Sequence, residues 1–207
     1  MTNIGYPVVL NLAGKTVLVV GAGPVGRRKV ARLREAGAFV RVVSLEERHV
    51  DFHGDEQIDW KVSGYAKEQL LGVALVFAAA TESINREVVR DAQSLGVFVN
   101  SASEPESGDF ELPAIVQRGR FSLAVSTGGA SPAFARAIKM KLQNEFDESY
   151  GEYVEVLSAI RETILAEVPD PVRRRELLSQ LAEEKWFAQF RHEGATAMRT
   201  AFAKRIE

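Results

Sequence analysis

Three glycines near the N-terminus have the spacing of a loop that binds phosphate groups. Gly21, Gly23 and Gly26 form the pattern G-x-G-x-x-G, after the apolar run 15–20 and at the start of a helical pattern that opens with Pro24. The first glycine permits a tight turn, the second lets a pyrophosphate approach the backbone, and the third lets the helix pack on the strand. The phosphates would meet free N–H groups at the positive end of the helix. The pattern predicts dinucleotide binding; the alternative is a glycine-rich turn that only packs.

The segment after the second expected strand, 39–43, bears on the choice of dinucleotide. An acidic residue that binds the ribose hydroxyls usually ends this strand, but Ser44 occupies the position, followed by Leu45 and Glu46. Glu46 could reach the ribose, or it could belong with Glu47 to a solvated loop. Because no arginine directly follows the strand to bind a 2′-phosphate, the sequence favours NAD over NADP.

A second glycine segment, 126–132, joins an expected strand to an expected helix. Its backbone amides and hydroxyls could bind an anionic group at the helix N-terminus, or the segment could be a flexible turn with a good helix cap. Arg118, Arg120 and Arg136 lie nearby in the sequence. They could bind substrate carboxylates, or they could be ordinary surface charges.

Two histidines, His49 and His53, are four residues apart. On a helix this spacing can bind a metal ion. Val50, Phe52 and Gly54 are instead typical of a loop that leads into a strand. We therefore expect no metal site here.

Alternating strand and helix signals must position the first glycine loop. A uniformly apolar strand at 73–77 is typical of burial on both faces, and the strand at 58–62 is expected near a sheet edge. Strands separated by helices imply a parallel sheet with right-handed crossovers. The expected strands are 15–20, 39–43, 58–62, 73–77 and 97–100, and the expected helices are 24–36 and 84–95.

The pattern changes near residue 105. We expect strands at 110–116 and 121–126, then a helix capped by Ser131 with Pro132 at its first position. One face of this helix is apolar, and everything beyond Gly151 is expected to be helical. The residues expected on that face are Phe134, Ile138, Leu142 and Phe146. The prediction is an α/β fold: a Rossmann-like parallel sheet over 1–113, a short β-α region over 114–148 and a helical domain over 149–207.

The composition excludes several classes of protein. The chain has 207 residues and no cysteine, which excludes disulfides, thiolate metal sites and a cysteine nucleophile. A net charge of -2 does not favour bulk nucleic-acid or membrane-surface binding. The start lacks the layout of a signal peptide, and the longest apolar run, 73–80, is far shorter than the roughly 20 residues that span a bilayer. We therefore expect a cytoplasmic protein.

The whole chain resembles the bifunctional precorrin-2 dehydrogenase/sirohydrochlorin ferrochelatase module of siroheme synthases. The first matching segment is generic to dinucleotide binders, whereas the last, together with Val99 and Asn100, is specific. The four segments are 19–29, 78–82, Val99-Asn100 followed by 109–114, and 124–132.

This resemblance implies a function, an architecture and a set of site residues. The family oxidises precorrin-2 to sirohydrochlorin with NAD, and many members then insert ferrous iron. A Rossmann domain, a dimerisation region and a helical domain are implied, as is a homodimer. The implied cofactor residues are Gly21, Gly23, Pro24, Val25, Gly26, Leu45, Glu46 and Thr81, the last on the nicotinamide side, and the implied tetrapyrrole residues are Asn100, Thr127, Gly128 and Gly129.

One departure from the family pattern bears on catalysis. The family usually reads V-N-x-x-D, with the aspartate as the proposed acid/base, but Ser103 occupies that place here. A serine hydroxyl is no general base near neutral pH without a partner. The adjacent Glu104 or the nearby Asp109 could substitute if the loop is re-registered, so the candidate catalytic residues are Ser103 and Glu104. Since pyrrole protons must leave as iron enters, we expect dehydrogenation to be kept and chelation to be weak.

Two alternatives to this enzyme remain open. One is a non-catalytic protein that binds and delivers NAD or a tetrapyrrole, which Ser103 would favour. The other is a small Rossmann oxidoreductase with an unrelated substrate, which the match over 110–137 disfavours.

Overall fold

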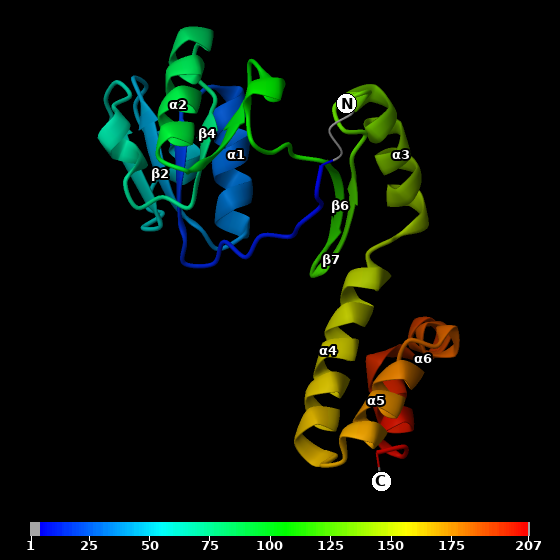
Figure 1. The fold of residues 1–207 in the computed structure, drawn as a ribbon. Helices are drawn as coiled ribbons and strands as arrows, with labels where there is room; N and C mark the ends of the chain where they lie inside the picture. The colour runs from blue at the N-terminus through cyan, green and yellow to red at the C-terminus, as the bar shows by residue number, and fades with distance from the viewer. Residues whose placement is uncertain (1–4, 207) are drawn as a thin grey trace. The chain divides into compact units, whose positions relative to one another are not determined.

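The computed structural model describes residues 5–206, which divide into two compact units (Figure 1). The first unit ends at Leu112 and the second begins at Pro113. Each unit has its own hydrophobic core.

The first unit is built on a parallel sheet whose described strands are ordered β3-β2-β1-β4-β5. From β1 the chain moves outward to β2 and β3, and then returns to the other side of β1 as β4. The order therefore reverses between β1 and β4, which is where parallel α/β sheets bind ligands. The strands are β1 (Thr16–Val20), β2 (Phe39–Ser44), β3 (Ile58–Val62), β4 (Leu75–Ala78) and β5 (Phe98–Ser101).

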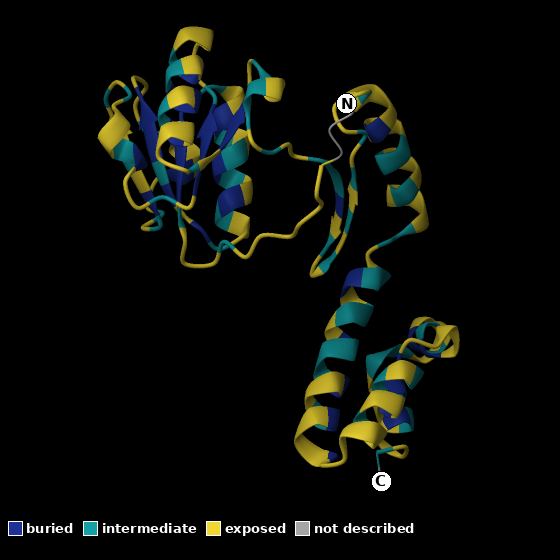
Figure 2. Cartoon of the chain, viewed as in Figure 1, coloured by how far each residue is buried: buried dark blue, intermediate teal, exposed yellow. Residues whose placement is uncertain are grey.

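Two helices cover opposite faces of this sheet. Successive strand residues point to opposite faces, so Val17 and Val19 of β1 pack with α1 (Pro24–Glu35), while Leu18 and Val20 pack in the core that contains α2 (Glu82–Ser94). The strands between the two helices are largely buried and are dark blue in Figure 2. The expected α/β fold is confirmed, with β3 at an edge and every residue of β4 buried. Short 3-10 helices complete the unit: η1 (Val50–Phe52), η2 (Lys67–Leu70) and η3 (Pro105–Ser107).

The largest error in the predicted elements is the strand expected at 110–116. Asp109 instead covers edge strand β5: its N–H donates to the Val99 carbonyl (2.7 Å), and its Oδ2 accepts from the Val99 N–H (3.0 Å). Phe110 packs edge-on against Phe77, with ring centroids 5.5 Å apart. The apolar residues at the start of the predicted strand therefore close the first unit, and the hairpin begins only at Ala114.

The second unit begins with an antiparallel hairpin of β6 (Ala114–Arg118) and β7 (Phe121–Val125). A Cβ atom at Gly151 would lie 2.6 Å from the Arg118 carbonyl oxygen, so glycine is required where a helix starts against the hairpin. The Nε atom of Arg118 donates to the Phe146 carbonyl (3.0 Å) and fixes the chain just before that helix. The helices of this unit are α3 (Pro132–Glu145), α4 (Ser149–Glu167), α5 (Pro171–Gln180) and α6 (Glu184–Ala203).

A row of aromatic rings leads from the hairpin into the helices. Phe121 stacks on Phe146 (5.6 Å between centroids), Phe146 contacts Tyr150 (4.9 Å), and Tyr150 contacts Phe187 of α6 (4.5 Å). Aromatic pairs at these separations add to the free energy of burial. The row joins the hairpin to the helical core, although α6 itself bends at Gly194, where φ is 85°.

Helix α3 buries little of its apolar face within the second unit. Phe134 and Met140 are 59% and 62% exposed, and Figure 2 shows the helix mostly in the exposed and intermediate colours. The expected apolar face is thus only partly buried: Ile138, Leu142 and Phe146 are of intermediate burial.

Lys29 of α1 is half-buried, with its Nζ atom 4.7 Å from the centroid of the Phe77 ring. Burial, together with the charges of Arg32 and Arg28, lowers the pKa of Lys29 to about 8. Because the folded pKa lies below the ordinary lysine value, the unfolded chain binds more protons between those two values. The free energy of unfolding should therefore rise with pH from about 8 to about 10.5.

We expect Lys29→Met to keep an alkyl chain on Phe77 while removing the charge. The free energy of unfolding at pH 7 should increase by about 1 kcal/mol, a value reduced for solvent screening. Its rise with pH above 8 should disappear. Urea denaturation at pH 7 and at pH 9.5 measures both effects, with the exposed Lys15→Met as the control. Equal pH dependence in wild type and Lys29→Met would contradict the expectation.

Candidate functional site

The first glycine loop lies at the carboxyl edge of the sheet, between β1 and α1. Gly21 has φ 98°, and a Cβ atom there would overlap the Ala79 carbonyl group. A Cβ atom at Gly26 would overlap the carbonyl oxygen of Gly21. The Gly21 N–H also donates to the Val43 carbonyl at the end of β2 (2.8 Å). Both glycines are therefore required by the close passage of backbone segments.

Gly23 differs from its two neighbours in the motif. Its φ of -63° and ψ of -179° suit any residue, and a Cβ atom there would meet no described atom within 4 Å outside its immediate neighbours. The fold does not require glycine at this position, but a methyl group would fill the space next to the helix. Since the described residues supply no side-chain cap to α1, its first-turn amides can bind an anion. The loop therefore fits a pyrophosphate.

The end of β2 holds the backbone of Glu46 in place. The Glu46 N–H donates to Ser44 Oγ (3.0 Å), and Trp60 Nε1 donates to the Glu46 carbonyl (3.0 Å). The Glu46 side chain is exposed, as is Leu45. Arg48, the next arginine, donates from Nε to the Phe52 carbonyl (3.0 Å) and from a terminal nitrogen to the Asp55 carbonyl (2.7 Å). The carboxylate can therefore face a ligand, while this arginine is already engaged.

Asn85, which the sequence patterns did not single out, is 1% exposed on the inner face of α2. Its Oδ1 accepts from the Ala80 N–H (2.9 Å), and its Nδ2 donates to Ser103 Oγ (3.0 Å) and to the Ala80 carbonyl (3.3 Å). The sequence signal that could have identified Asn85 is its spacing: it lies three residues before Val88 and seven before Ala92, on the face of α2 that is buried. Leu95, the apolar residue that ends the expected helix 84–95, is by contrast 42% exposed.

Both carboxylates near Ser103, those of Glu104 and Asp109, have bonded partners. Ser103 is exposed and accepts the hydrogen bond from Asn85. Glu104 Oε1 lies 3.1 Å from Arg86 Nε, and Asp109 is bonded to the backbone of β5. The edge of the sheet thus presents a hydroxyl at 103 and a carboxylate at 104 that pairs with Arg86, which also pairs with Glu82.

The remaining predicted site residues of the first unit are Thr81, Asn100, Pro24 and Val25. Thr81 is the residue before α2, with its Oγ1 3.2 Å from Ser83 Oγ. Asn100 is buried, and its Nδ2 donates to the Phe110 carbonyl (2.9 Å). Pro24 and Val25 begin α1 directly after Gly23. The structure brings Gly21, Gly23, Thr81, Glu46 and Ser103 to one edge of the sheet, because each follows the carboxyl end of a parallel strand.

The second glycine loop lies in the second unit. The Gly128 N–H donates to Ser126 Oγ (3.0 Å), the Ala130 N–H to the Thr127 carbonyl (3.1 Å) and the Ser131 N–H to Thr127 Oγ1 (3.0 Å). Gly128 and Gly129 have φ of 58° and 79°. Several of its amides are therefore engaged within the loop, and Ser131 caps α3 as expected by accepting from the Phe134 N–H.

The three arginines near this loop differ in their engagement. Arg118 bonds to the carbonyls of Phe146 and Gln143. Arg120 donates to Ser158 Oγ (2.8 Å). Arg136 is exposed, and within residues 5–206 its guanidinium has no bonded partner. Arg136 is thus the one of the three whose charge is most available to a ligand.

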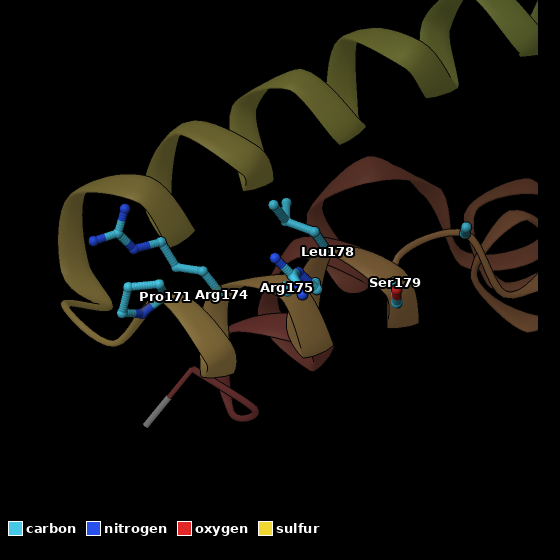
Figure 3. Close-up of a pocket in the computed structure, with 6 residues that line it drawn as sticks. Pro171, Arg174, Arg175, Leu178 and Ser179 are labelled. Atoms are coloured by element: carbon cyan, nitrogen blue, oxygen red, sulfur yellow. The ribbon is translucent and has the colours of Figure 1, made fainter.

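An open pocket of about 560 Å³ lies on α5 (Figure 3). Arg174 lines it, but its guanidinium donates to the carbonyls of Val168 and Pro169 at the end of α4. None of the residues predicted for the site lines this pocket, which is formed by Pro171, Arg174, Arg175, Leu178, Ser179 and Ala182.

The two histidines flank the short helix η1 rather than sharing one helix face. His49 Nδ1 accepts from the Asp51 N–H (3.4 Å), and His53 bonds to the Arg48 carbonyl (3.0 Å). Over residues 5–206 no three histidine, cysteine, aspartate or glutamate side chains gather to hold a metal ion. Over the same span we find no helix that is long and apolar enough to cross a membrane.

The parallel sheet, its reversal of strand order and the glycine loop define a protein of the NAD(P)-binding class. Residues 8–114 match the family profile described as putative NAD(P)-binding, and residues 118–145 match the profile of the sirohaem biosynthesis protein central region. The chain belongs to the family of precorrin-2 dehydrogenases and siroheme synthases, which confirms the resemblance seen in its sequence.

Three similar proteins show the extent of the match. A precorrin-2 dehydrogenase of Priestia megaterium is 33% identical over 87% of this chain and 91% of its own. A siroheme synthase of Nitrosococcus oceani is 34% identical over 94% of this chain, which spans only 43% of that longer protein. The solved structure of "SirC, precorrin-2 dehydrogenase" superposes with a TM-score of 0.77 at 28% identity, covering 98% of both chains.

We expect Gly23→Ala and Gly26→Ala to separate cofactor binding from folding. Gly23→Ala should leave the melting temperature within about 2 °C but weaken NAD binding at least about tenfold, because its methyl group enters the pyrophosphate space. Gly26→Ala should lower both the melting temperature and the affinity for NAD, because its methyl group overlaps the carbonyl oxygen of Gly21. Calorimetric titration with NAD and thermal denaturation measure the two effects. Undiminished NAD binding by Gly23→Ala would contradict the placement of the pyrophosphate.

Proposed function

We propose that the chain is an NAD-dependent dehydrogenase that oxidises precorrin-2 to sirohydrochlorin in siroheme biosynthesis. The observation that carries the proposal is the open space at Gly23, which the fold leaves at a helix N-terminus in a member of this family. A cytoplasmic location is part of the same proposal, since NAD is available there.

NAD rather than NADP is the proposed cofactor. Support comes from Glu46, whose fixed backbone places an exposed carboxylate after β2, where it can accept from the ribose hydroxyls. The same carboxylate would repel a 2′-phosphate, and Arg48 is engaged with backbone carbonyls.

We expect Glu46→Gln to reduce the preference for NAD over NADP by about tenfold, equivalent to about 1.4 kcal/mol. Loss of the charge weakens the ribose contact and removes the repulsion of a 2′-phosphate. The ratio of kcat/KM for the two cofactors measures this preference, and Glu47→Gln is the matched control. An unchanged ratio in Glu46→Gln would place the ribose elsewhere.

The chain's residues have distinct parts in the proposed reaction. The bound NAD would supply the acceptor for a hydride from precorrin-2, and one proton would leave with it. Gly21, Gly23 and Gly26 hold the pyrophosphate, and Thr81 lies on the nicotinamide side. The proposed tetrapyrrole residues are Asn100, Thr127, Gly128 and Gly129. Catalysis of hydride transfer then rests on how these groups orient the two reactants.

Iron insertion is proposed to be weak. Two pyrrole protons must leave as ferrous iron enters the macrocycle, and this requires a base. Ser103 offers a hydroxyl, and the carboxylate of Glu104 pairs with Arg86 at 3.1 Å. In dehydrogenation the hydride goes to the cofactor, and the one proton that is released can pass to water, because residue 103 is exposed.

We expect anaerobic assays with precorrin-2 and NAD to yield NADH and sirohydrochlorin without acceleration of iron insertion. Ser103→Asp should accelerate iron insertion at least about tenfold, within the usual range for a positioned acid or base. Asn85 Nδ2 can donate to this carboxylate as it does to the hydroxyl. Ser103→Asn is the uncharged control, because asparagine has the same shape as aspartate.

Other outcomes of these assays would have definite meanings. Rapid iron insertion by the wild type would show that another residue is the base. NAD binding without NADH formation would favour the alternative of a non-catalytic binding protein. The ion pair between Glu104 and Arg86 also supports that alternative.

A homodimer formed through residues 114–148 is the last part of the proposal, with residues 149–207 as a separate helical domain. Support comes from Phe134 and Met140, which α3 leaves largely exposed. A second copy would cover both.

We expect Met140→Glu to convert a dimer to a monomer in sedimentation equilibrium, because the charge would enter an apolar contact. Val172→Glu, at an equally exposed apolar position on α5, should leave the dimer intact. A dimer that persists in Met140→Glu would move the interface away from α3.

A further inference from the structure

The buried side chain of Asn85 makes three hydrogen bonds. Two of its three bonds satisfy the backbone of Ala80, at 2.9 Å and 3.3 Å. The third, from Nδ2 to Ser103 Oγ at 3.0 Å, reaches an exposed residue that could bond to water instead. Both amide hydrogens of the buried Asn85 are thereby bonded, and the third bond also fixes the hydroxyl of Ser103.

The contacts of Asn85 join three loops at the carboxyl edge of the sheet. The Ala79 carbonyl lies directly against Gly21 of the cofactor loop, where even a Cβ atom would overlap it. Asn85 holds the next residue, Ala80, and through Nδ2 it holds Ser103 after β5. The position of the Ser103 hydroxyl is therefore set relative to the glycine loop by a continuous series of short contacts.

The direction of the bond to Ser103 follows from the partners. The Ala80 N–H is a donor, so the amide oxygen of Asn85 must face it and the amide nitrogen must face Ser103. Since Ser103 Oγ accepts this bond, its own hydrogen is left to donate to another atom. Residue 103 thus presents a hydrogen-bond donor at the ligand edge.

We infer that Asn85 is a positioning residue that holds the Ser103 hydroxyl as a donor to an acceptor atom of the carboxylate-bearing tetrapyrrole. This inference rests on the proposed function. It assigns to Ser103 a part in substrate orientation, which is distinct from the acid/base part of the aspartate that it replaces.

A double-mutant cycle tests the inference with the full-length protein. Asn85→Ala and Ser103→Ala should each lower kcat about tenfold and weaken sirohydrochlorin binding by a similar factor, with KM for NAD within about twofold of wild type. The double variant should be no worse than either single one. Gln93→Ala is the matched control, because Gln93 also joins α2 to the chain beyond β5, by a bond to the Ser107 carbonyl.

Asn85→Asp provides a second test if Asn85→Ala fails to fold. A carboxyl group buried at this position has a raised pKa. When protonated it can donate to Ser103 as the amide does; when ionised it accepts from the hydroxyl and turns the donor inward. Sirohydrochlorin affinity should therefore fall about tenfold as pH rises through that pKa, but not in Asn85→Asp/Ser103→Ala. The nearby charges of Arg86, Glu82 and Glu104 are common to all variants and cancel in the comparison.

The outcomes separate this inference from the proposed function. Wild-type protein that binds sirohydrochlorin but forms no NADH overturns the proposed activity, while the binding cycle still decides the part of Asn85. An active wild type with additive losses, or with normal kcat and affinity in Ser103→Ala, overturns the inference. Wild-type protein that does not bind sirohydrochlorin overturns both.

Discussion

The close passage of two backbone segments at Gly21 is the constraint on which the rest of the first unit depends. Gly26 must lie against the Gly21 carbonyl, and Gly21 against the Ala79 carbonyl, so the ends of β1, β4 and α1 have one arrangement. Backbone packing of this kind is possible only without side chains. It leaves Gly23 as the open position and directs the amides of the first turn of α1 toward it.

Polar contacts extend this arrangement across the sheet edge. An asparagine in an apolar layer is tolerated because its bonds are satisfied by backbone groups that also need partners. Asn85 meets this condition through Ala80, and Trp60 has a comparable effect at the other end by fixing the carbonyl of Glu46. The backbone of the loops that face the ligand is therefore held by bonds to side chains of the sheet and its helices.

Local patterns made most of the fold predictable from the sequence. The glycine spacing, the uniformly apolar β4 and the Ser131-Pro132 cap each carry their structural meaning within a few residues, and the structure confirms them. Phe110 was misassigned because the residues from 110 to 116 fit a strand equally well, and only its packing against Phe77 through tertiary folding decides the outcome. Asn85 could not be placed because its partners, Ala80 and Ser103, meet it through tertiary folding. The bend at Gly194 was likewise hidden within a long helical pattern.

The bonds between Asp109 and Val99 bear on where the chain can be divided. They occupy backbone groups of β5 that would otherwise form an open sheet edge, and open edges promote aggregation by pairing with other chains. The edge is covered by residues that follow the last strand by several positions. A fragment ending at β5 would keep every strand of the sheet yet lose its protection against self-association, so the smallest well-behaved nucleotide-binding fragment must extend through Phe110.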